Sequence, residues 1–271
     1  MAQLKFALFG HPVAHSLSPQ IHQQFAKHVG LDLDYQLIDV PSEHFEAVVT
    51  AFFANGGRGA NVTLPHKQQA LALAKGQTRI AAQSGAANTL FVDGDGRLWA
   101  DNTDAPGFIE DIQQLGWQPQ HSVLIWGNGG AARGIVAGLL AAGAQAVTIC
   151  GRSQAKSEAL ARCFAAQAVK TIGWDEKNAV TCEWLINATS VSPDFARWLP
   201  NTPPSVYYDL NYASRAMSAV QAAKARGIVA HDGLGMLVRQ AAFAFERWTQ
   251  QPLTSEVVEH VVEWLRQLAR P

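Results

Sequence analysis

The chain has little of what marks several protein classes. Only three of its 271 residues are cysteines, Cys150, Cys163 and Cys182, and no two of them form a Cys-x-x-Cys pair. This odd, unspaced set argues against a disulfide framework or a cysteine zinc site and favours a reducing compartment. Charged residues make up 16% of the chain and leave a net charge of −1, so nothing favours nucleic acid or an anionic membrane as partner.

Long apolar runs are also missing. Before Gly10 the N-terminus offers one lysine and the short apolar stretch 6–9, which is too little for a secretion signal. No other apolar run is long enough to span a bilayer. We therefore expect a cytoplasmic protein with no membrane partner. The 48% of hydrophobic residues can fill a sizeable core, and the length suggests about two domains or one large one.

What the chain does contain is a glycine-rich turn between a predicted strand, 122–126, and a predicted helix, 134–142. Gly127 permits a sharp turn, Gly129 lets a pyrophosphate approach the backbone, and Ala132 lets the helix pack close to the strand. The N–H groups and positive dipole end of the helix then face the phosphates. The alternative is a glycine turn that binds nothing. The predicted phosphate-binding residues are Gly127, Asn128, Gly129, Gly130 and Ala131.

The next predicted strand, 146–150, ends where dinucleotide-binding folds contact the ribose. An NAD site usually carries Asp or Glu there, to accept a hydrogen bond from the 2′-hydroxyl. Here Arg152, Ser153 and, a turn later, Lys156 can hold a 2′-phosphate instead. The sequence therefore predicts NADP rather than NAD. The alternative is an ordinary solvated, basic helix start.

Near the N-terminus, two serines precede a proline that can open a helix over 20–27. The hydroxyls of Ser16 and Ser18 can accept helix N–H groups as caps, which the residues alone favour, or donate to a substrate carboxylate. We expect no metal site here, because no carboxylate or cysteine lies at ligand spacing from the nearby histidines. These histidines are His11, His15 and His22.

A predicted strand over 59–64 leads into a helix opened by Pro65, with Lys67 in its first turn. The positive end of a helix dipole disfavours a charged amine, which suits proton exchange near neutrality, whereas the alternative is a solvent-pointing surface lysine. Asp104 follows a predicted hairpin. Its carboxylate can orient such an amine, cap the helix over 105–115, or do both.

Strands and helices alternate along the chain, which predicts an α/β fold with mainly parallel sheets. Helices are expected over 20–27, 42–53, 69–83, 105–115, 134–142, 214–225, 236–250 and 256–268. Strands are expected over 4–9, 35–40, 59–64, 122–126, 146–150, 184–190, 206–212 and 227–230, with a hairpin turn at 93–96.

Together these segments resemble the shikimate dehydrogenase family over nearly the whole chain. The matching stretches are 12–19, 60–67 apart from His66, 88–90, 101–104, the turn 127–133, 187–190 and 232–238. The resemblance implies two α/β domains across a cleft. These are a substrate-binding domain, 1–103 with 238–271 returning to it, and a Rossmann-type NADP domain, 104–237. It further implies reversible reduction of 3-dehydroshikimate to shikimate in the biosynthesis of chorismate and aromatic amino acids, by a monomer or homodimer.

The resemblance also implies roles for single residues. Lys67 and Asp104 match the catalytic pair, with Lys67 as proton donor to the carbonyl oxygen and Asp104 bonded to a neighbouring hydroxyl. The implied substrate contacts are Ser16, Ser18, Thr63, Asn88, Tyr212 and Gln240. The cofactor contacts expected beyond the glycine turn are Arg152, Ser153, Lys156, Thr189, Ser190, Leu210 and Gly233.

The chain departs from the family pattern at four places beside the cofactor. Two changes are mild, because Ser153 replaces threonine and keeps a hydroxyl, and Leu210 replaces a frequent methionine. Gly151 stands where the family has asparagine, which predicts weaker NADP binding, and the loop 191–194 replaces a glycine-methionine pair. One alternative is a relative that also oxidises quinate or uses NAD. Another is a catalytically silent ligand-binding protein, against which the intact Lys67 and Asp104 argue.

Overall fold

The computed structural model describes residues 3–164 and 168–268 and divides the chain into two compact units. The first unit comprises residues 1–107 and 237–271, and the second comprises residues 108–236. Two helices carry the chain between them, α5 (Asp104–Gln114) and α10 (Leu234–Thr249). The first boundary thus falls inside α5, between residues 107 and 108, whereas the predicted boundary lies between residues 103 and 104.

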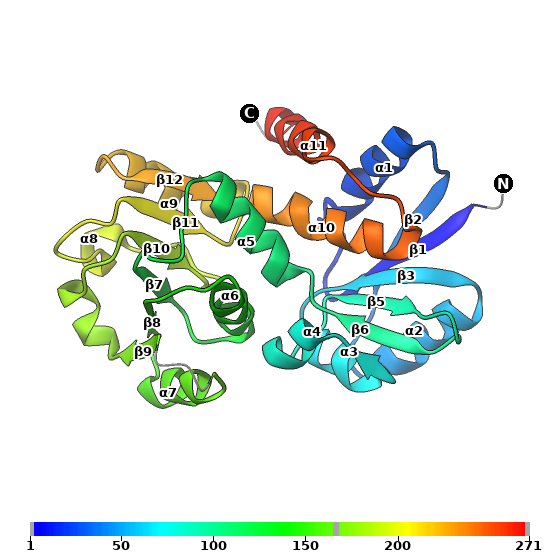
Figure 1. Ribbon diagram of the computed structural model, residues 1–271, viewed down its shortest axis with the longest axis horizontal. Helices are drawn as coiled ribbons and strands as arrows, with labels where there is room; N and C mark the ends of the chain where they lie inside the picture. The colour runs from blue at the N-terminus through cyan, green and yellow to red at the C-terminus, as the bar shows by residue number, and fades with distance from the viewer. Residues whose placement is uncertain (1–2, 165–167, 269–271) are drawn as a thin grey trace. The chain divides into compact units, whose positions relative to one another are not determined.

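The first unit is built on a six-stranded mixed sheet with the order β2-β1-β3-β5-β6-β4 (Figure 1). Its strands are β1 (Leu4–Gly10), β2 (Leu33–Asp39), β3 (Gly57–Val62), β4 (Gly76–Gln77), β5 (Thr89–Val92) and β6 (Leu98–Asp101). β1 is parallel to β2 and β3, whereas β5 is antiparallel to β3 and β6. The carboxyl ends of β1, β3 and β6 therefore lie beside the amino end of β5. We call this side of the sheet its polar edge.

Successive residues of a strand point to opposite sides, so β1 contributes apolar side chains to both faces of this sheet, and helices cover both faces. Phe9 of β1 packs in one core with Phe45 of α2, whereas Phe6 stacks on Trp248 of α10 at 5.0 Å between ring centroids. Gly59 of β3 leaves room for the same indole. The remaining helices of this unit are α1 (Ser18–Val29), α2 (Phe45–Ala54), α3 (Lys67–Leu73), α4 (Arg79–Ser84) and α11 (Ser255–Leu268).

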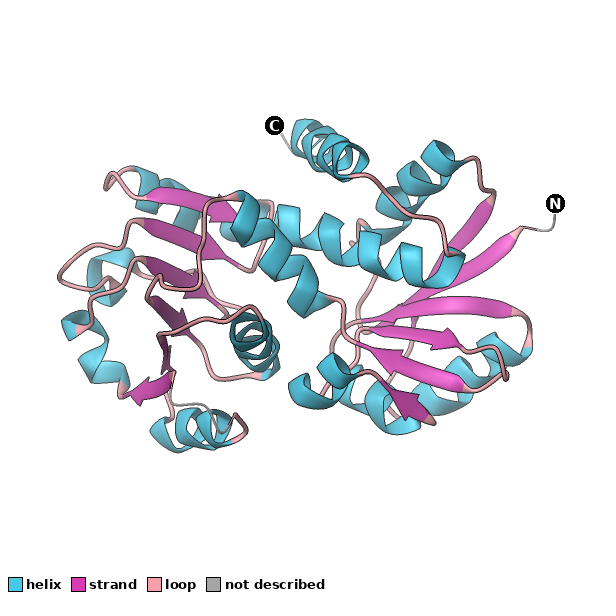
Figure 2. Ribbon diagram, viewed as in Figure 1, coloured by secondary structure: helices cyan, strands magenta, loops and turns pink. Residues whose placement is uncertain are grey.

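The second unit is a wholly parallel sheet with the order β12-β11-β10-β7-β8-β9, flanked by helices (Figure 2). Its strands are β7 (Val123–Trp126), β8 (Val147–Cys150), β9 (Val169–Ile172), β10 (Trp184–Asn187), β11 (Val206–Asp209) and β12 (Val229–Asp232). Its other elements are α6 (Gly130–Ala141), α7 (Gln154–Arg162), the 3-10 helix η1 (Trp174–Ala179), α8 (Phe195–Trp198) and α9 (Ser214–Lys224). Strand order reverses between β7 and β10, as in doubly wound dinucleotide folds.

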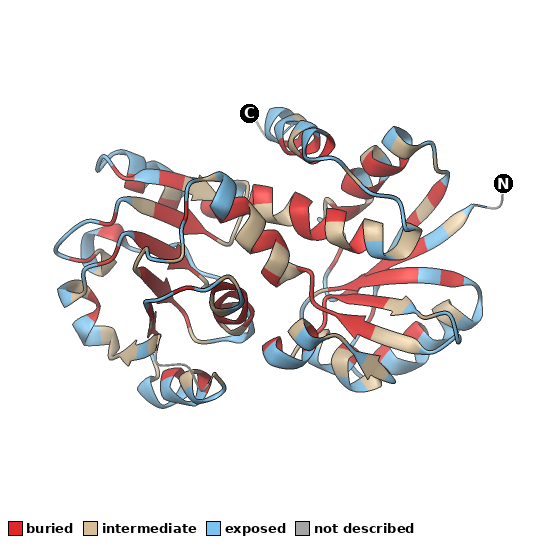
Figure 3. Ribbon diagram, in the orientation of Figure 1, coloured by how far each residue is buried: buried red, intermediate tan, exposed pale blue. Residues whose placement is uncertain are grey.

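The central strands of the second sheet are buried on both faces (Figure 3). Ile125 of β7 packs in one core with Ile135 of α6, while its neighbour Leu124 packs in a second core with Ala219 of α9. This double burial explains why these strands are continuous apolar runs rather than alternating ones.

The helix expected over 69–83 is wrong. The segment forms α3 and α4 with the short strand β4 between them. Gly76 pairs with Trp99 of β6, and a Cβ at this glycine would lie 2.5 Å from the indole, so only glycine fits there. Thr78 then caps α4 by accepting from the N–H of Ala81. Sheet pairing therefore overrides the helical spacing.

No helix in residues 3–164 and 168–268 is long and apolar enough to cross a membrane.

Candidate active site

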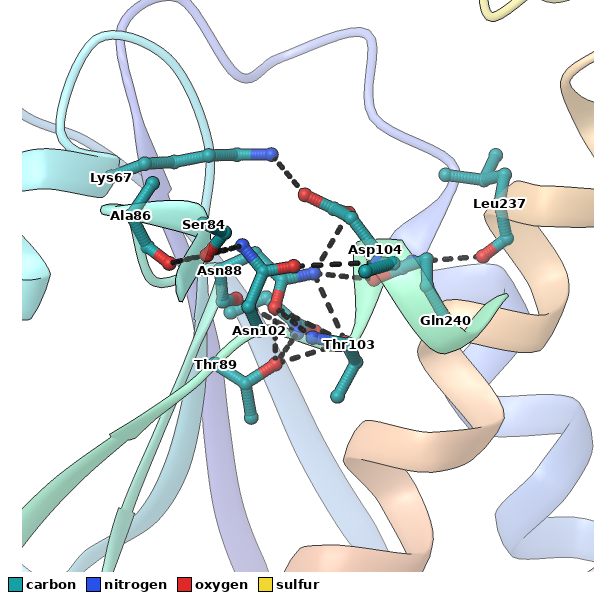
Figure 4. A network of polar contacts seen from close by, with 12 residues as sticks. Lys67, Ser84, Ala86, Asn88, Thr89, Asn102, Thr103, Asp104, Leu237 and Gln240 are labelled. Carbon is teal, nitrogen blue, oxygen red and sulfur yellow. Dashed lines mark hydrogen bonds and ion pairs between the residues drawn. The ribbon is translucent and has the colours of Figure 1, made fainter. Parts of the chain in front are cut away.

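The polar edge of the first sheet brings Lys67 and Asp104 together (Figure 4). Lys67 is the first residue of α3, which follows β3, and Asp104 is the first residue of α5, which follows β6. Lys67 Nζ donates to Asp104 Oδ2 at 2.5 Å, and the two side chains are 28% and 23% exposed. The amine is therefore held in place by the carboxylate while both groups stay open to a ligand.

Asn88, just before β5, holds the other oxygen of this carboxylate. Its Nδ2 lies 2.8 Å from Asp104 Oδ1 and 3.1 Å from Gln240 Oε1. Its Oδ1 accepts from the N–H of Thr103 at 2.8 Å and from the hydroxyl of Thr89 at 2.9 Å. Because Asn88 is buried and bonded on both sides, the position of Asp104 is fixed from within the sheet.

Gln240 reaches this site from α10, far along the chain. Its Nε2 donates to the carbonyl of Leu237 at 2.8 Å, which orients the amide toward Asn88. Gly107 of α5 makes the approach possible, since a Cβ there would lie 2.6 Å from the backbone N of Gln240.

Capping of α5 falls to Asn102, whose Oδ1 accepts from the N–H of Ala105 at 3.4 Å. The neighbouring Asp101 is buried, accepts from Thr78 Oγ1 and forms an ion pair with Arg247 at 2.9 Å. Asp101 thus has a structural role, and the carboxylate of Asp104 is left for Lys67 and Asn88.

The two serines lie at the start of α1, and only one of them serves the helix. Ser16 Oγ accepts from the backbone N–H of Ser18 at 3.2 Å, and the two hydroxyl oxygens are 3.1 Å apart. The N-cap residue is Leu17, which has no capping side chain. Capping therefore accounts for Ser16 and does not account for the hydroxyl of Ser18.

A buried polar chain leads from Ser18 into the core, and sequence reasoning missed it. Ser18 hydrogen-bonds Tyr35, whose hydroxyl donates to Asn61 Oδ1 at 2.7 Å. The ring of His22 stacks on Tyr35, and its Nε2 lies 3.2 Å from the same Asn61 oxygen. Asn61 Nδ2 donates in turn to the backbone carbonyl of Asn88 at 3.3 Å. The only sequence signal was a polar asparagine on a small-residue strand.

Burial is the largest influence on the pKa values of Tyr35 and His22 in this buried polar chain. Burial raises the pKa of Tyr35 and lowers the pKa of His22 to about 3, and the hydrogen bond of His22 to Asn61 opposes the latter shift without cancelling it. Both groups are therefore neutral around neutral pH.

Thr63, directly after β3, is the last predicted substrate contact at the polar edge. Its backbone N–H donates to the carbonyl of Phe9 at 2.8 Å.

The glycine turn of the second unit lies at the carboxyl end of β7 and fits a pyrophosphate. Gly127 has φ of +119°, and a Cβ there would lie 2.9 Å from the carbonyl of Ala188. Gly129 and Gly130 differ, because a Cβ at either would meet nothing within 4 Å. α6 begins at Gly130, and Gly130 and Ala131 are both exposed, so the start of this helix is accessible to a phosphate.

Three further strand ends supply the other residues expected to contact the dinucleotide. Thr189, after β10, donates from Oγ1 to Asn187 Oδ1 at 2.7 Å, and its carbonyl accepts from Asn211 Nδ2 at 2.9 Å. Gly233, after β12, is packed so closely that a Cβ would lie 2.5 Å from the carbonyl of Leu210. The exposed Ser190 precedes the loop 191–194, whose first carbonyl accepts from Thr189 Oγ1 at 3.1 Å.

The basic residues after β8 are presented to solvent. Ser153 caps α7 by accepting from the N–H of Lys156 at 3.4 Å, as an ordinary helix start requires. Arg152 and Lys156 are exposed, and neither side chain has an ion-pair partner among the residues that the structure describes. The exposed Arg152 and Lys156, beside the hydroxyl of Ser153, suit a phosphate monoester.

Tyr212 belongs to the second unit and remains a prediction as a substrate contact. Its side chain is partly buried, and this burial raises its pKa. Across the described part of the chain, no three His, Cys, Asp or Glu side chains gather as a metal site would require.

Three family models match the chain. Residues 8–90 match the shikimate dehydrogenase substrate-binding domain, residues 112–193 match shikimate/quinate 5-dehydrogenase, and residues 233–263 match the shikimate 5′-dehydrogenase C-terminal domain.

Solved structures resemble the chain over almost its whole length. An Ael1 enzyme from Pseudomonas putida is 33% identical, with a TM-score of 0.85 over 96% of this chain and 98% of that one. Shikimate 5-dehydrogenase from Thermus thermophilus, in complex with NADP(H) and shikimate, is 33% identical, with a TM-score of 0.85 over 97% and 99%. Ligand-free 5-ketofructose reductase of Gluconobacter sp. strain CHM43 is 28% identical, with a TM-score of 0.85 over 98% and 99%.

The buried His22 predicts a loss of stability in acid. An unfolded histidine titrates near 6.5, whereas folded His22 titrates near 3, so between these values only the unfolded chain binds the proton. Stability therefore falls as pH drops below 6.5, by about 1.4 kcal/mol per pH unit from this group. His22→Phe keeps the stacked ring. When the free energy of unfolding is measured with urea at several pH values in this range, its slope against pH should be shallower in this variant by about that amount.

Phe25→Leu serves as the control, since Phe25 neighbours His22 in the same core and cannot titrate. It should lower stability at every pH and leave the slope unchanged. Equal slopes for the parent chain and His22→Phe would show that His22 does not set the acid limit.

Proposed function

The chain belongs to the shikimate dehydrogenase family, and we propose that it catalyses the reversible, NADP-dependent reduction of 3-dehydroshikimate to shikimate. The observation that carries the proposal is the 2.5 Å ion pair between Lys67 and Asp104, open to ligand and braced by Asn88. A lysine held by a carboxylate at a sheet edge is the acid–base group that reduction of a carbonyl requires.

Substrate binding follows from the groups along the polar edge. The hydroxyls of Ser16 and Ser18, 3.1 Å apart, are the donors for the substrate carboxylate. Shikimate also carries ring hydroxyls, which need groups that both donate and accept. The residues proposed to contact them are Thr63, Asn88, Asp104, Tyr212 and Gln240.

The chemistry assigned to the protein is proton transfer. NADPH, when bound, supplies the hydride for the carbonyl carbon. Negative charge then develops on the carbonyl oxygen, and Lys67 delivers the proton from Nζ to that atom. Asp104 holds the amine through Oδ2 and accepts a hydrogen bond from an adjacent substrate hydroxyl. In the oxidative direction Lys67 takes the proton back.

The cofactor is assigned to the carboxyl edge of the second sheet, where an open helix start and the exposed Arg152 and Lys156 fit its phosphates. Gly127, Asn128, Gly129, Gly130 and Ala131 form the turn proposed for the pyrophosphate. Arg152, Ser153 and Lys156 are proposed for the 2′-phosphate, and Thr189, Ser190, Leu210 and Gly233 for the nicotinamide end.

A related substrate is the second candidate, because the family includes enzymes with other substrates. One family model is described for both shikimate and quinate, and the Gluconobacter relative is a 5-ketofructose reductase. The paired hydroxyls of Ser16 and Ser18 favour a carboxylated substrate over a neutral sugar. Quinate has the same carboxylate and is therefore the nearer competitor.

The cellular setting is inferred from the cysteines. The three cysteines are free thiols, which is typical of a reducing compartment such as the cytoplasm. We propose that the enzyme works there as a monomer or homodimer.

Lys67→Ala should fold and bind shikimate, yet lower kcat by about 10²- to 10⁴-fold, because proton transfer loses its donor. Steady-state kinetics, with shikimate affinity measured by calorimetry, test this. Lys27→Ala, on the exposed side of α1, is the control and should retain full turnover. Unchanged turnover in Lys67→Ala would remove the proton-transfer role.

Arg152→Ala should raise KM for NADP by roughly 10- to 100-fold, the value of a charged hydrogen-bonded contact, and leave KM for NAD nearly unchanged. The exposed Arg162→Ala, at the other end of α7, controls for loss of positive charge. An equal effect of Arg152→Ala on both cofactors would contradict recognition of the 2′-phosphate.

A further inference from the structure

The space beside Gly151 is filled from a different loop. Gly151 is buried directly after β8, and a Cβ there would overlap the carboxamide of Asn128. The backbone of Gly151 does not need a glycine, because its φ lies outside the left-handed region. The side chain of Asn128 is therefore what excludes a side chain at position 151.

Asn128 also ties the two loops together. Its Nδ2 donates to the backbone carbonyl of Ser153 at 2.9 Å and lies 3.1 Å from Ser157 Oγ. Ser157 is buried, and its hydroxyl donates to the same carbonyl at 3.3 Å. The turn after β7 is thus fixed to the first turn of α7.

Arg152 lies between the two points that Asn128 fixes, with Gly151 on one side and Ser153 on the other. Its own side chain is exposed and unpaired among the described residues, so its backbone position depends on these neighbours. A loop that is already ordered loses less conformational entropy when it binds a ligand.

We propose that Asn128 is a positioning residue that sets the preference for the 2′-phosphate of the cofactor, by holding the loop that carries Arg152. The inference rests on the proposed function, since it assumes that Arg152 binds this phosphate. It also revises the expectation that Gly151 weakens NADP binding: the side chain missing at 151 is replaced by one from position 128.

The test measures binding of two probes by calorimetry, adenosine 2′,5′-bisphosphate and 5′-AMP. Asn128→Ala should weaken the bisphosphate about five- to tenfold, the value of one or two hydrogen bonds, and weaken 5′-AMP clearly less, because only the bisphosphate carries the phosphate assigned to Arg152. Gly151→Asn alone should also weaken the bisphosphate, because its side chain collides with Asn128.

The double variant Asn128→Ala/Gly151→Asn is decisive, because it returns an amide to the same space from the other loop. It should bind the bisphosphate more tightly than either single variant. Losses that add in the double variant, or an Asn128→Ala effect equal on both probes, would overturn the proposal. Thermal unfolding of each variant identifies any loss that comes from misfolding.

Arg152→Ala separates the two levels of the argument. If it leaves the preference for the bisphosphate intact, the proposed NADP site itself fails. If it removes that preference while Asn128→Ala does not, only the positioning role of Asn128 fails.

Discussion

The structure of the site depends on one buried amide. Asn88 bonds to Asp104 and Gln240 on one side and to Thr103 and Thr89 on the other, so strand, hairpin and two helices meet at its side chain. A buried amide is stable only when its donors and acceptors are satisfied, so these groups must be in register together. The ion pair of Lys67 with Asp104 is positioned by this requirement.

Glycines at close approaches are a second recurring constraint. Gly107 admits the backbone of Gln240 to the first site, Gly233 lies against the carbonyl of Leu210, and Gly151 admits the carboxamide of Asn128. Gly129 and Gly130 differ, because a Cβ at either would meet no atom of the described residues within 4 Å. The packed glycines let neighbouring segments approach closely, whereas Gly129 and Gly130 leave the start of α6 open.

Local patterns predicted most of the elements but not all of them, and few of their contacts. The apolar run of β7 and the glycine turn after it are local signals, and the predicted α/β class with a Rossmann-type unit is confirmed. The helix predicted across Gly76 failed, because pairing with Trp99 is a long-range contact. The Ser18–Tyr35–Asn61 hydrogen-bonded chain was not predicted either, because it also consists of long-range contacts. The residues alone allowed Asp104 to orient Lys67 but left capping and a surface lysine open, because the two residues begin separate helices far apart in the sequence. The resemblance decided for the pair.

The central claim is that the polar edge binds a carboxylated ring alcohol and exchanges its proton through Lys67. The most direct measurement is a steady-state assay of the purified protein that follows cofactor reduction with shikimate and quinate, each with NADP and NAD. The account predicts the highest kcat/KM with shikimate and NADP. No turnover with any pair, in protein that still binds shikimate, would contradict it and indicate a binding protein that has kept the fold.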